Sequence, residues 1–128
     1  MKITINETIN LTEEIVSNIL ASTFTAISYW AEGMYPKDYG TLKKEDVEKL
    51  SSDEAYAKIL LAGGTLEIID LERDFKDTTL NLVKLAIGIE KAISKYPHCV
   101  DIDNIDMSDD TGCDIIMQLA VFNEIVYG

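Results

Sequence analysis

The chain has 128 residues, a length that fits one domain, 1–128, with a hydrophobic core of useful size. Apolar residues make up 47% of it and charged residues 27%, which is a globular composition and excludes a disordered chain. Asp and Glu number 23 against 11 Lys and Arg, a formal net charge of -12 that argues against direct nucleic-acid binding and against attraction to an anionic membrane.

The first third of the chain predicts a strand, a helix and a second strand. Residues 2–9 alternate apolar and polar side chains, which is the period of a strand with one face in water. Thr12 is a suitable N-cap for the helix that follows, whose apolar stripe indicates an end near Thr23. Residues 25–32 are rich in aromatic and β-branched side chains and predict the second strand; continuation of the helix to Trp30 is the alternative.

The middle of the chain begins with a polar segment. Residues 33–50 contain two glycines and a proline and predict mostly loop, with a short helix or turn over 43–50. Ser51 and Ser52 can cap the next helix. Gly63-Gly64 would end that helix, because glycine adopts the left-handed cap conformation without steric cost.

A hairpin and a long helix are expected next. Residues 65–71 predict a strand, and residues 75–79 can return as a short antiparallel partner across a charged turn. One of residues 77–79, Asp-Thr-Thr, is expected to cap the helix that Pro97 stops. Gly88 within this helix costs about 1 kcal/mol relative to alanine, which indicates a close packing contact there.

The last quarter of the chain carries most of the net negative charge. Residues 96–128 contain seven acidic residues and no Lys or Arg, a net charge of -7, whereas the first 95 residues carry the remaining -5 of the total of -12. Residues 113–126 are apolar on nearly every side, which is typical of a buried helix. Asp109 or Asp110 is expected to cap that helix.

The order of these elements favours an α+β fold. Because isolated two-stranded sheets are marginally stable, three to four strands should pair in one small antiparallel sheet. Three to four helices should pack mainly on one face of this sheet.

The sequence also predicts a cytoplasmic protein. The N-terminus has no apolar signal segment, and no apolar run approaches the roughly 18 residues that cross a bilayer. The cysteines Cys99 and Cys113 are therefore expected to be reduced and to pack as small apolar side chains.

The aspartate-rich segment has three interpretations. Carboxylate oxygens suit calcium or magnesium, and Asp101, Asp103 and Asp106 would be the ligands of a divalent-metal site. The EF-hand pattern does not fit from Asp101 or from Asp106, so we predict no metal and no other cofactor. The other two interpretations are a solvated acidic loop and an electrostatic surface for a basic partner.

Residues that could carry out catalysis are few. The single histidine, His98, stands beside Cys99, and adjacent residues seldom direct both side chains to one point. Two cysteines and one histidine lack the C-x-x-C spacing of a zinc site, and Gly63-Gly64 is not part of a phosphate-binding loop. We therefore expect no enzymatic activity and assign no catalytic residue.

One pattern extends along nearly the whole chain: Tyr29-Trp30, Gly63-Gly64-Thr65-Leu66 with Asp70, Gly88, and the aspartate segment followed by residues 114–128. Its most specific part is Gln-x-Ala-x-Phe-x-Glu-x-Val-Tyr-Gly at 118–128. The pattern resembles a family of small acidic proteins carried by phages and integrative mobile elements, although Asn123 stands where that family would have a glycine. The resemblance implies a mobile-element accessory protein and transfers no catalytic residue.

We expect a non-enzymatic protein that binds and blocks a basic protein partner, such as a nuclease or another nucleic-acid-binding protein. Anti-CRISPR and anti-restriction inhibitors of mobile elements act in this way, some by mimicking nucleic acid with a dense array of carboxylates. The predicted acidic residues are Asp101, Asp103, Asp106, Asp109, Asp110, Asp114, Glu67, Asp70, Glu72 and Asp74. Tyr29, Trp30 and Tyr35 are candidates for an additional aromatic contact.

Two alternatives stay open. A self-associating accessory or regulatory protein, for example a homodimer, would use an exposed Trp30 and the apolar C-terminal helix as its interface. A divalent-metal-binding protein would use Asp101, Asp103 and Asp106.

Overall fold

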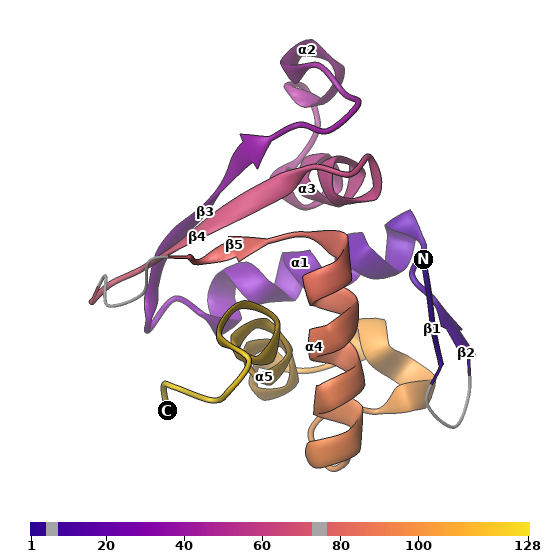
Figure 1. Ribbon diagram of the computed structural model, residues 1–128, viewed down its shortest axis with the longest axis vertical. Helices are drawn as coiled ribbons and strands as arrows, with labels where there is room; N and C mark the ends of the chain where they lie inside the picture. Colours follow the sequence, from indigo (N-terminus) through magenta and orange to yellow (C-terminus); the bar gives the residue numbers. More distant parts are fainter. Residues whose placement is uncertain (5–7, 73–76) are drawn as a thin grey trace.

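The computed structural model describes residues 1–4, 8–72 and 77–128, and it confirms the α+β fold (Figure 1). In chain order the elements are β1 (Lys2–Thr4), β2 (Thr8–Asn10), α1 (Glu13–Ala26), β3 (Ala31–Asp38), α2 (Lys44–Val47), α3 (Ser52–Leu61), β4 (Thr65–Asp70), β5 (Thr79–Leu80), α4 (Leu82–Lys95), the 3-10 helix η1 (Ile102–Met107) and α5 (Asp110–Phe122). The strands form a two-stranded sheet, β1-β2, and a three-stranded sheet in the order β3-β4-β5, both antiparallel.

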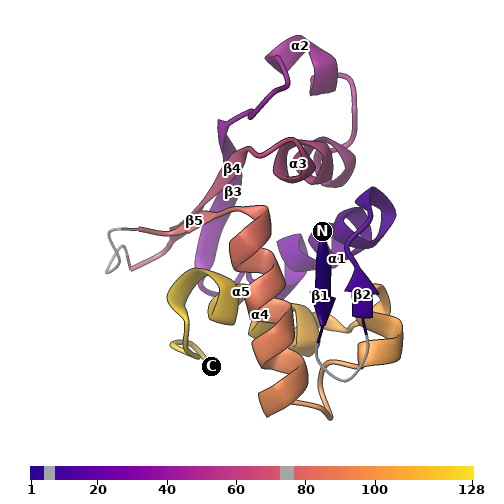
Figure 2. The ribbon, with the colours of Figure 1, turned by 45° about the vertical axis from the view of Figure 1, so that its right-hand side comes forward.

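One hydrophobic core joins the larger sheet to the helices. Fully buried side chains from α1, α3, β4, α4 and α5 belong to it: Leu20, Ile59, Leu66, Leu85 and Ile116. Helix α1 contacts α3, α5 and η1, and α4 packs along α5. Figure 2 shows the β3-β4-β5 sheet at the left of the molecule, with α1, α3 and α4 to its right and α5 below it.

The N-terminal region differs from its prediction in two ways. The segment predicted as one strand over residues 2–9 contains two short strands that pair with each other, Ile3 opposite Ile9, and an alternating pattern cannot distinguish these cases. Helix α1 passes the expected end at Thr23 and reaches Ala26. Thr23 fits inside the helix because its hydroxyl donates to the Ile19 carbonyl at 2.7 Å.

Strand β3 occupies a segment that the sequence predicted as loop. Residues 27–30 form a turn rather than the predicted strand, and β3 begins only at Ala31. Pro36, which supported the loop prediction, is tolerated because β3 is an edge strand. An edge strand pairs on one side only, so a residue without an N–H can be accommodated there. The pairing of β3 with β4 shifts register near both ends of the strand, at Ala31/Gly33 and at Pro36/Asp38, which accommodates the glycine and the proline.

The predicted antiparallel pairing after β4 is present, but its second strand begins later than expected. Strand β4 pairs with β5 in antiparallel register, Leu66 opposite Leu80, although the predicted return strand over 75–79 falls partly outside the described residues. The N-cap of α4 is Asn81, whose Oδ1 accepts from the Lys84 N–H at 2.8 Å, and not one of residues 77–79. Asp77 instead accepts from the Thr79 N–H and hydroxyl at 3.0 and 2.6 Å.

Helix α5 is buried, as predicted, and Asp109 is its N-cap. Gly88 of α4 permits its close approach: a Cβ atom at position 88 would lie 2.6 Å from the Ile116 carbonyl oxygen. The helix ends at Phe122 rather than near Val126, because Asn123 adopts a left-handed conformation with φ of 64°. This conformation favours glycine and, after glycine, asparagine.

The smaller helices agree with their predictions. Helix α2 lies within the expected 43–50 segment, and Ser51 occupies the N-cap position of α3. Gly63, with φ of 85°, follows the C-cap of α3. Within the described parts of the chain, none of the helices combines the length and the apolar character needed to cross a membrane.

Candidate functional site

Four exposed aspartates of the predicted acidic set follow α4 in the chain. Asp101 and Asp103 lie at the start of η1, and Asp109 and Asp110 lie at the start of α5. Asp101 accepts from the Asp103 N–H at 2.9 Å and from the Asn104 amide at 3.3 Å. Asp109 accepts from the Gly112 N–H at 2.9 Å. Two of the four carboxylates are thus fixed by local hydrogen bonds.

A polar hollow of about 370 Å³ brings parts of this segment together. Asp101 and Asp109 both line it, with His98, Cys99 and Ser108 among the other lining residues. The described residues contain no group of three or more His, Cys, Asp and Glu side chains arranged to hold a metal ion. The side chain of Asp106, the third predicted metal ligand, lies outside what the structure describes.

Asp70 was wrongly predicted to lie on the acidic surface. The alternating burial of β4 places Leu66, Ile68 and Asp70 on its buried face, and Asp70 is only 2% exposed. Glu67 points to the opposite, half-buried face of the same strand. The strand therefore separates these two carboxylates.

Glu67 and Glu72 do not join the aspartates after α4. Glu72 is exposed just beyond the end of β4, and Asp74 lies outside the described residues. Neither Glu67 nor Glu72 lines the polar hollow that Asp101 and Asp109 share.

Trp30 was also wrongly predicted, because it is 2% exposed and forms no surface contact patch. Its indole Nε1 donates to Asp114 Oδ1 at 2.8 Å, and its neighbour Tyr29 donates its hydroxyl to Asp114 Oδ2. Asp114 is half-buried, so its carboxylate serves an internal network as well as the surface. The same burial contradicts the exposed Trp30 that the alternative homodimer interface would have used.

Gln118 completes the network and holds the C-terminal segment, residues 123–128. This side chain is 1% exposed, and its Nε2 donates to Asp114 Oδ1 at 2.9 Å. Its Oε1 accepts from the backbone N–H groups of Val126 and Tyr127, both at 2.8 Å, while Nε2 also donates to the Tyr127 carbonyl at 3.1 Å. The Gln118 amide therefore forms hydrogen bonds with two N–H groups and one carbonyl group of the C-terminal backbone.

Tyr127 ties the C-terminal segment to the sheet. Its ring stacks on Trp30, with centroids 5.4 Å apart and an interplanar angle of 6°. Its hydroxyl donates to Asp70 Oδ2 at 3.0 Å. The buried carboxylate of Asp70 is therefore hydrogen-bonded, which burial of a charge requires.

Tyr29 remains protonated at neutral pH. Burial and the adjacent Asp114 carboxylate raise the pKa of Tyr29 to about 12. Its hydroxyl therefore continues to donate to Asp114. The residue is nevertheless 52% exposed, so Tyr29 is the aromatic candidate of this region that reaches the surface.

The two cysteines are free thiols, as expected. Cys113 is buried, and burial together with the nearby Asp110 carboxylate raises its pKa to about 11. A thiol in this state is a poor nucleophile at neutral pH. Cys99 lies partly buried beside the exposed His98 in the polar hollow.

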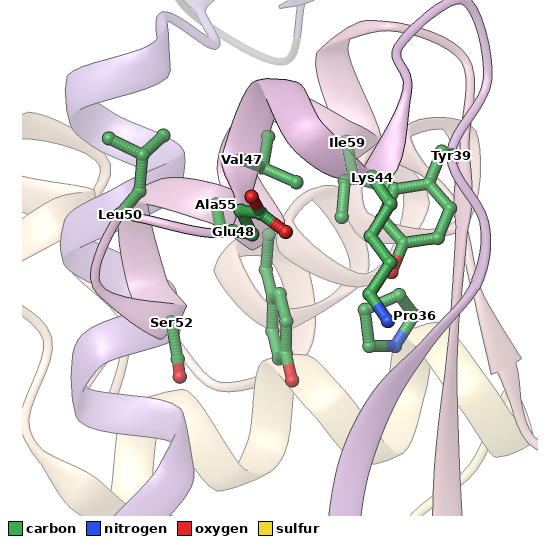
Figure 3. Close-up of a pocket in the computed structure, with 10 residues that line it drawn as sticks. Pro36, Tyr39, Lys44, Val47, Glu48, Leu50, Ser52, Ala55 and Ile59 are labelled. Atoms are coloured by element: carbon green, nitrogen blue, oxygen red, sulfur yellow. The ribbon is translucent and has the colours of Figure 1, made fainter.

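A second hollow, of about 170 Å³, lies between β3, α2 and α3 and is mainly apolar. Figure 3 shows Pro36, Tyr39 and Lys44 on one side of it and Leu50 and Ser52 on the other. Tyr35, the remaining aromatic candidate, is exposed on β3 but does not line this hollow. None of the predicted acidic residues lines it either.

Sequence reasoning missed Gln118 and Tyr127. Gln118 is the one polar residue in the apolar run 115–122, and a lone polar side chain on a helix expected to be buried indicates a buried hydrogen-bonding role. Tyr127 carried no comparable local signal, because its partners Trp30 and Asp70 are distant in the sequence.

Comparison of the chain with protein-family models, with curated proteins and with solved structures finds no match.

Proposed function

We propose that this protein is a non-enzymatic interaction protein that binds a basic partner through the exposed carboxylates of Asp101, Asp103, Asp109 and Asp110, here called the acidic face. One observation carries the proposal: these four exposed carboxylates lie within the last quarter of the chain, residues 96–128, which has no Lys or Arg, and hydrogen bonds hold two of them in place. The ion pairs Lys58–Glu13 and Lys84–Asp77 of the described residues leave all four untouched.

Charges held in this way favour association with a cationic surface. Complementary charge raises association rates and rejects partners of like charge. Carboxylates that are already ordered lose less conformational freedom on binding than freely rotating ones. The acidic face therefore suits a rigid, Lys- and Arg-lined surface better than a neutral one.

A protein with a nucleic-acid-binding groove is the class of partner that presents such a surface. The proposed action is to occupy that groove in place of phosphates. The resemblance to proteins of phages and mobile elements makes a cytoplasmic defence nuclease the proposed target within this class.

Inhibition of DNA cleavage by purified restriction and CRISPR nucleases tests the proposal. The informative variant reverses two charges of the acidic face, Asp103→Lys with Asp110→Lys, since neither side chain caps a helix. The matched control is Glu45→Lys with Glu54→Lys. All four residues are exposed acids in the first turn of a helix, so the two variants change the net charge equally and at similar positions.

We expect the wild-type protein and the control to inhibit a susceptible nuclease equally. The acidic-face variant should inhibit it at least about tenfold more weakly. Helix α2, which carries Glu45, lies at the opposite end of the molecule from the segment between α4 and α5 (Figure 2). Equal loss in both variants would show that net charge alone is responsible. Absence of inhibition across the panel would contradict a nuclease as the partner.

A further inference from the structure

A third hollow, of about 220 Å³, opens beside the C-terminal segment, and we call it the tyrosine pocket. Its lining includes three tyrosines, two isoleucines and one carboxylate: Tyr29, Tyr96, Tyr127, Ile115, Ile125 and Asp114. These residues come from the turn before β3, the end of α4, helix α5 and the C-terminal segment. The pocket thus combines aromatic and apolar walls with a single acidic side chain.

The hydrogen bonds of Asp114 leave a limited capacity for a ligand. An ionised carboxylate has about four lone-pair positions that accept hydrogen bonds. Trp30 and Gln118 donate to Oδ1, and Tyr29 donates to Oδ2, so three of these positions are taken. With the donors of the described residues counted, one position is left for a donor that enters the pocket.

The donors that the described residues direct at Asp114 are all neutral. The indole, the amide and the hydroxyl solvate the carboxylate but do not cancel its charge. Residues 96–128 contain no Lys or Arg, and the ion pairs Lys58–Glu13 and Lys84–Asp77 of the described residues do not include Asp114. The pocket therefore keeps a negative charge that a cation can neutralise.

The walls of the pocket suit a cation that carries an apolar stem. Tyrosine rings attract cations to their faces, and a half-buried site strengthens that attraction. Ile115 and Ile125 provide apolar surface for a hydrocarbon chain. A lysine side chain has both parts, because it buries its methylene stem along apolar surface and carries the charge at its tip.

We infer that the tyrosine pocket binds the ammonium group of a lysine side chain presented by the partner, with Asp114 as the anion and the tyrosines as its walls. Ammonium fits better than guanidinium, because the bidentate pairing that arginine prefers needs two free carboxylate positions and Asp114 has one. The partner's identity rests on the proposed function, but the pocket's preference for ammonium does not.

Titration of the full chain with n-butylammonium chloride, at constant ionic strength, tests the inference. The chain has a single tryptophan, and its indole N–H is bonded to Asp114, so the indole cross-peak in a proton–nitrogen correlation spectrum reports directly on the pocket. We expect a saturable shift of this peak with n-butylammonium and none with 1-butanol, which has the same stem without charge. Absence of a saturable shift, or an equal shift with 1-butanol, would overturn the inference.

Two substitutions sharpen the test. Asp114→Asn keeps the shape and removes the charge, and it should weaken n-butylammonium binding at least tenfold; unchanged binding would contradict the role of Asp114. Tyr29→Phe keeps the ring and frees one carboxylate position, so it should improve binding of n-butylguanidinium relative to n-butylammonium. Because Tyr29 is exposed, the Tyr29→Phe variant remains informative if the Asp114→Asn variant does not fold.

Matched controls separate the pocket from other surfaces. Tyr96→Leu should weaken n-butylammonium binding severalfold, whereas Tyr35→Leu, a change of the same kind outside the pocket, should leave it unaltered. The Asp103→Lys/Asp110→Lys variant should bind n-butylammonium within about twofold of wild type, because exposed charges outside the pocket are screened by salt. Failure of the pocket and failure of the acidic face therefore give different results.

Discussion

Replacing Gln118 with leucine should release the C-terminal segment from the core. Leucine has a similar size but neither accepts from the Val126 and Tyr127 N–H groups nor donates to the Tyr127 carbonyl. Each N–H that leucine shields from water and leaves without an acceptor costs about 1–3 kcal/mol. If the segment detaches instead, the protein loses these hydrogen bonds and the stacking on Trp30, which is worth about 0.5–1.5 kcal/mol. Either route lowers the free energy of unfolding by about 2–6 kcal/mol.

Urea denaturation and amide hydrogen exchange measure the two parts of this prediction. The free energy of unfolding should fall, and the amides of Val126 and Tyr127 should lose their protection from exchange. The control is Glu124→Gln, an exposed change in the same segment, which should alter stability by less than about 0.5 kcal/mol. A Gln118→Leu variant that is as stable as wild type, with both amides still protected, would refute the role given to Gln118.

Three further predictions rest on packing and on pKa shifts. Gly88→Ala should lower the free energy of unfolding by about 1–3 kcal/mol in urea denaturation, because the added methyl meets the backbone of α5. The tyrosinate absorbance of wild type minus that of Tyr29→Phe should titrate near the pKa of about 12. Because the folded-state pKa of Tyr29 exceeds its ordinary value of 10.0, its contribution to stability is complete below pH 10 and is lost as pH rises to about 12. With a folded-state pKa of about 11, Cys113 should react with a thiol reagent more slowly than the less buried Cys99; equal rates in the folded protein would contradict its burial.

The sequence predicts the helices of this protein better than its strands. Helices α3, α4 and α5 carry long apolar stripes and clear terminators, and their positions agree with the prediction within a few residues. Strand β3 has no such signal, because Gly33 and Pro36 are typical of loops and are accommodated only by its edge position and register shifts. Edge position is a property of the whole sheet and cannot be deduced from the strand's own residues.

The candidate site was predicted only in part, because some of its features depend on contacts between distant parts of the chain. The exposed aspartates after α4 follow from local composition, and the structure leaves four of them exposed. Asp70 belongs to the buried face of β4. Its spacing of two residues from Ile68 and four from Leu66 indicates that face, but a charged side chain was expected to lie on the surface. The tyrosine pocket depends on contacts between Tyr29 and residues more than eighty positions away, which local patterns do not contain.

The salt dependence of partner binding tests the acidic face most directly. Raising the ionic strength from about 0.1 M to about 1 M shortens the Debye length from about 10 Å to about 3 Å and screens exposed charges. We predict that the affinity of wild type for an inhibited nuclease falls steeply over this range, and that Asp103→Lys/Asp110→Lys flattens the dependence while Glu45→Lys/Glu54→Lys does not. Affinity that is unchanged by salt, or a slope that the acidic-face variant leaves intact, would contradict binding through these carboxylates.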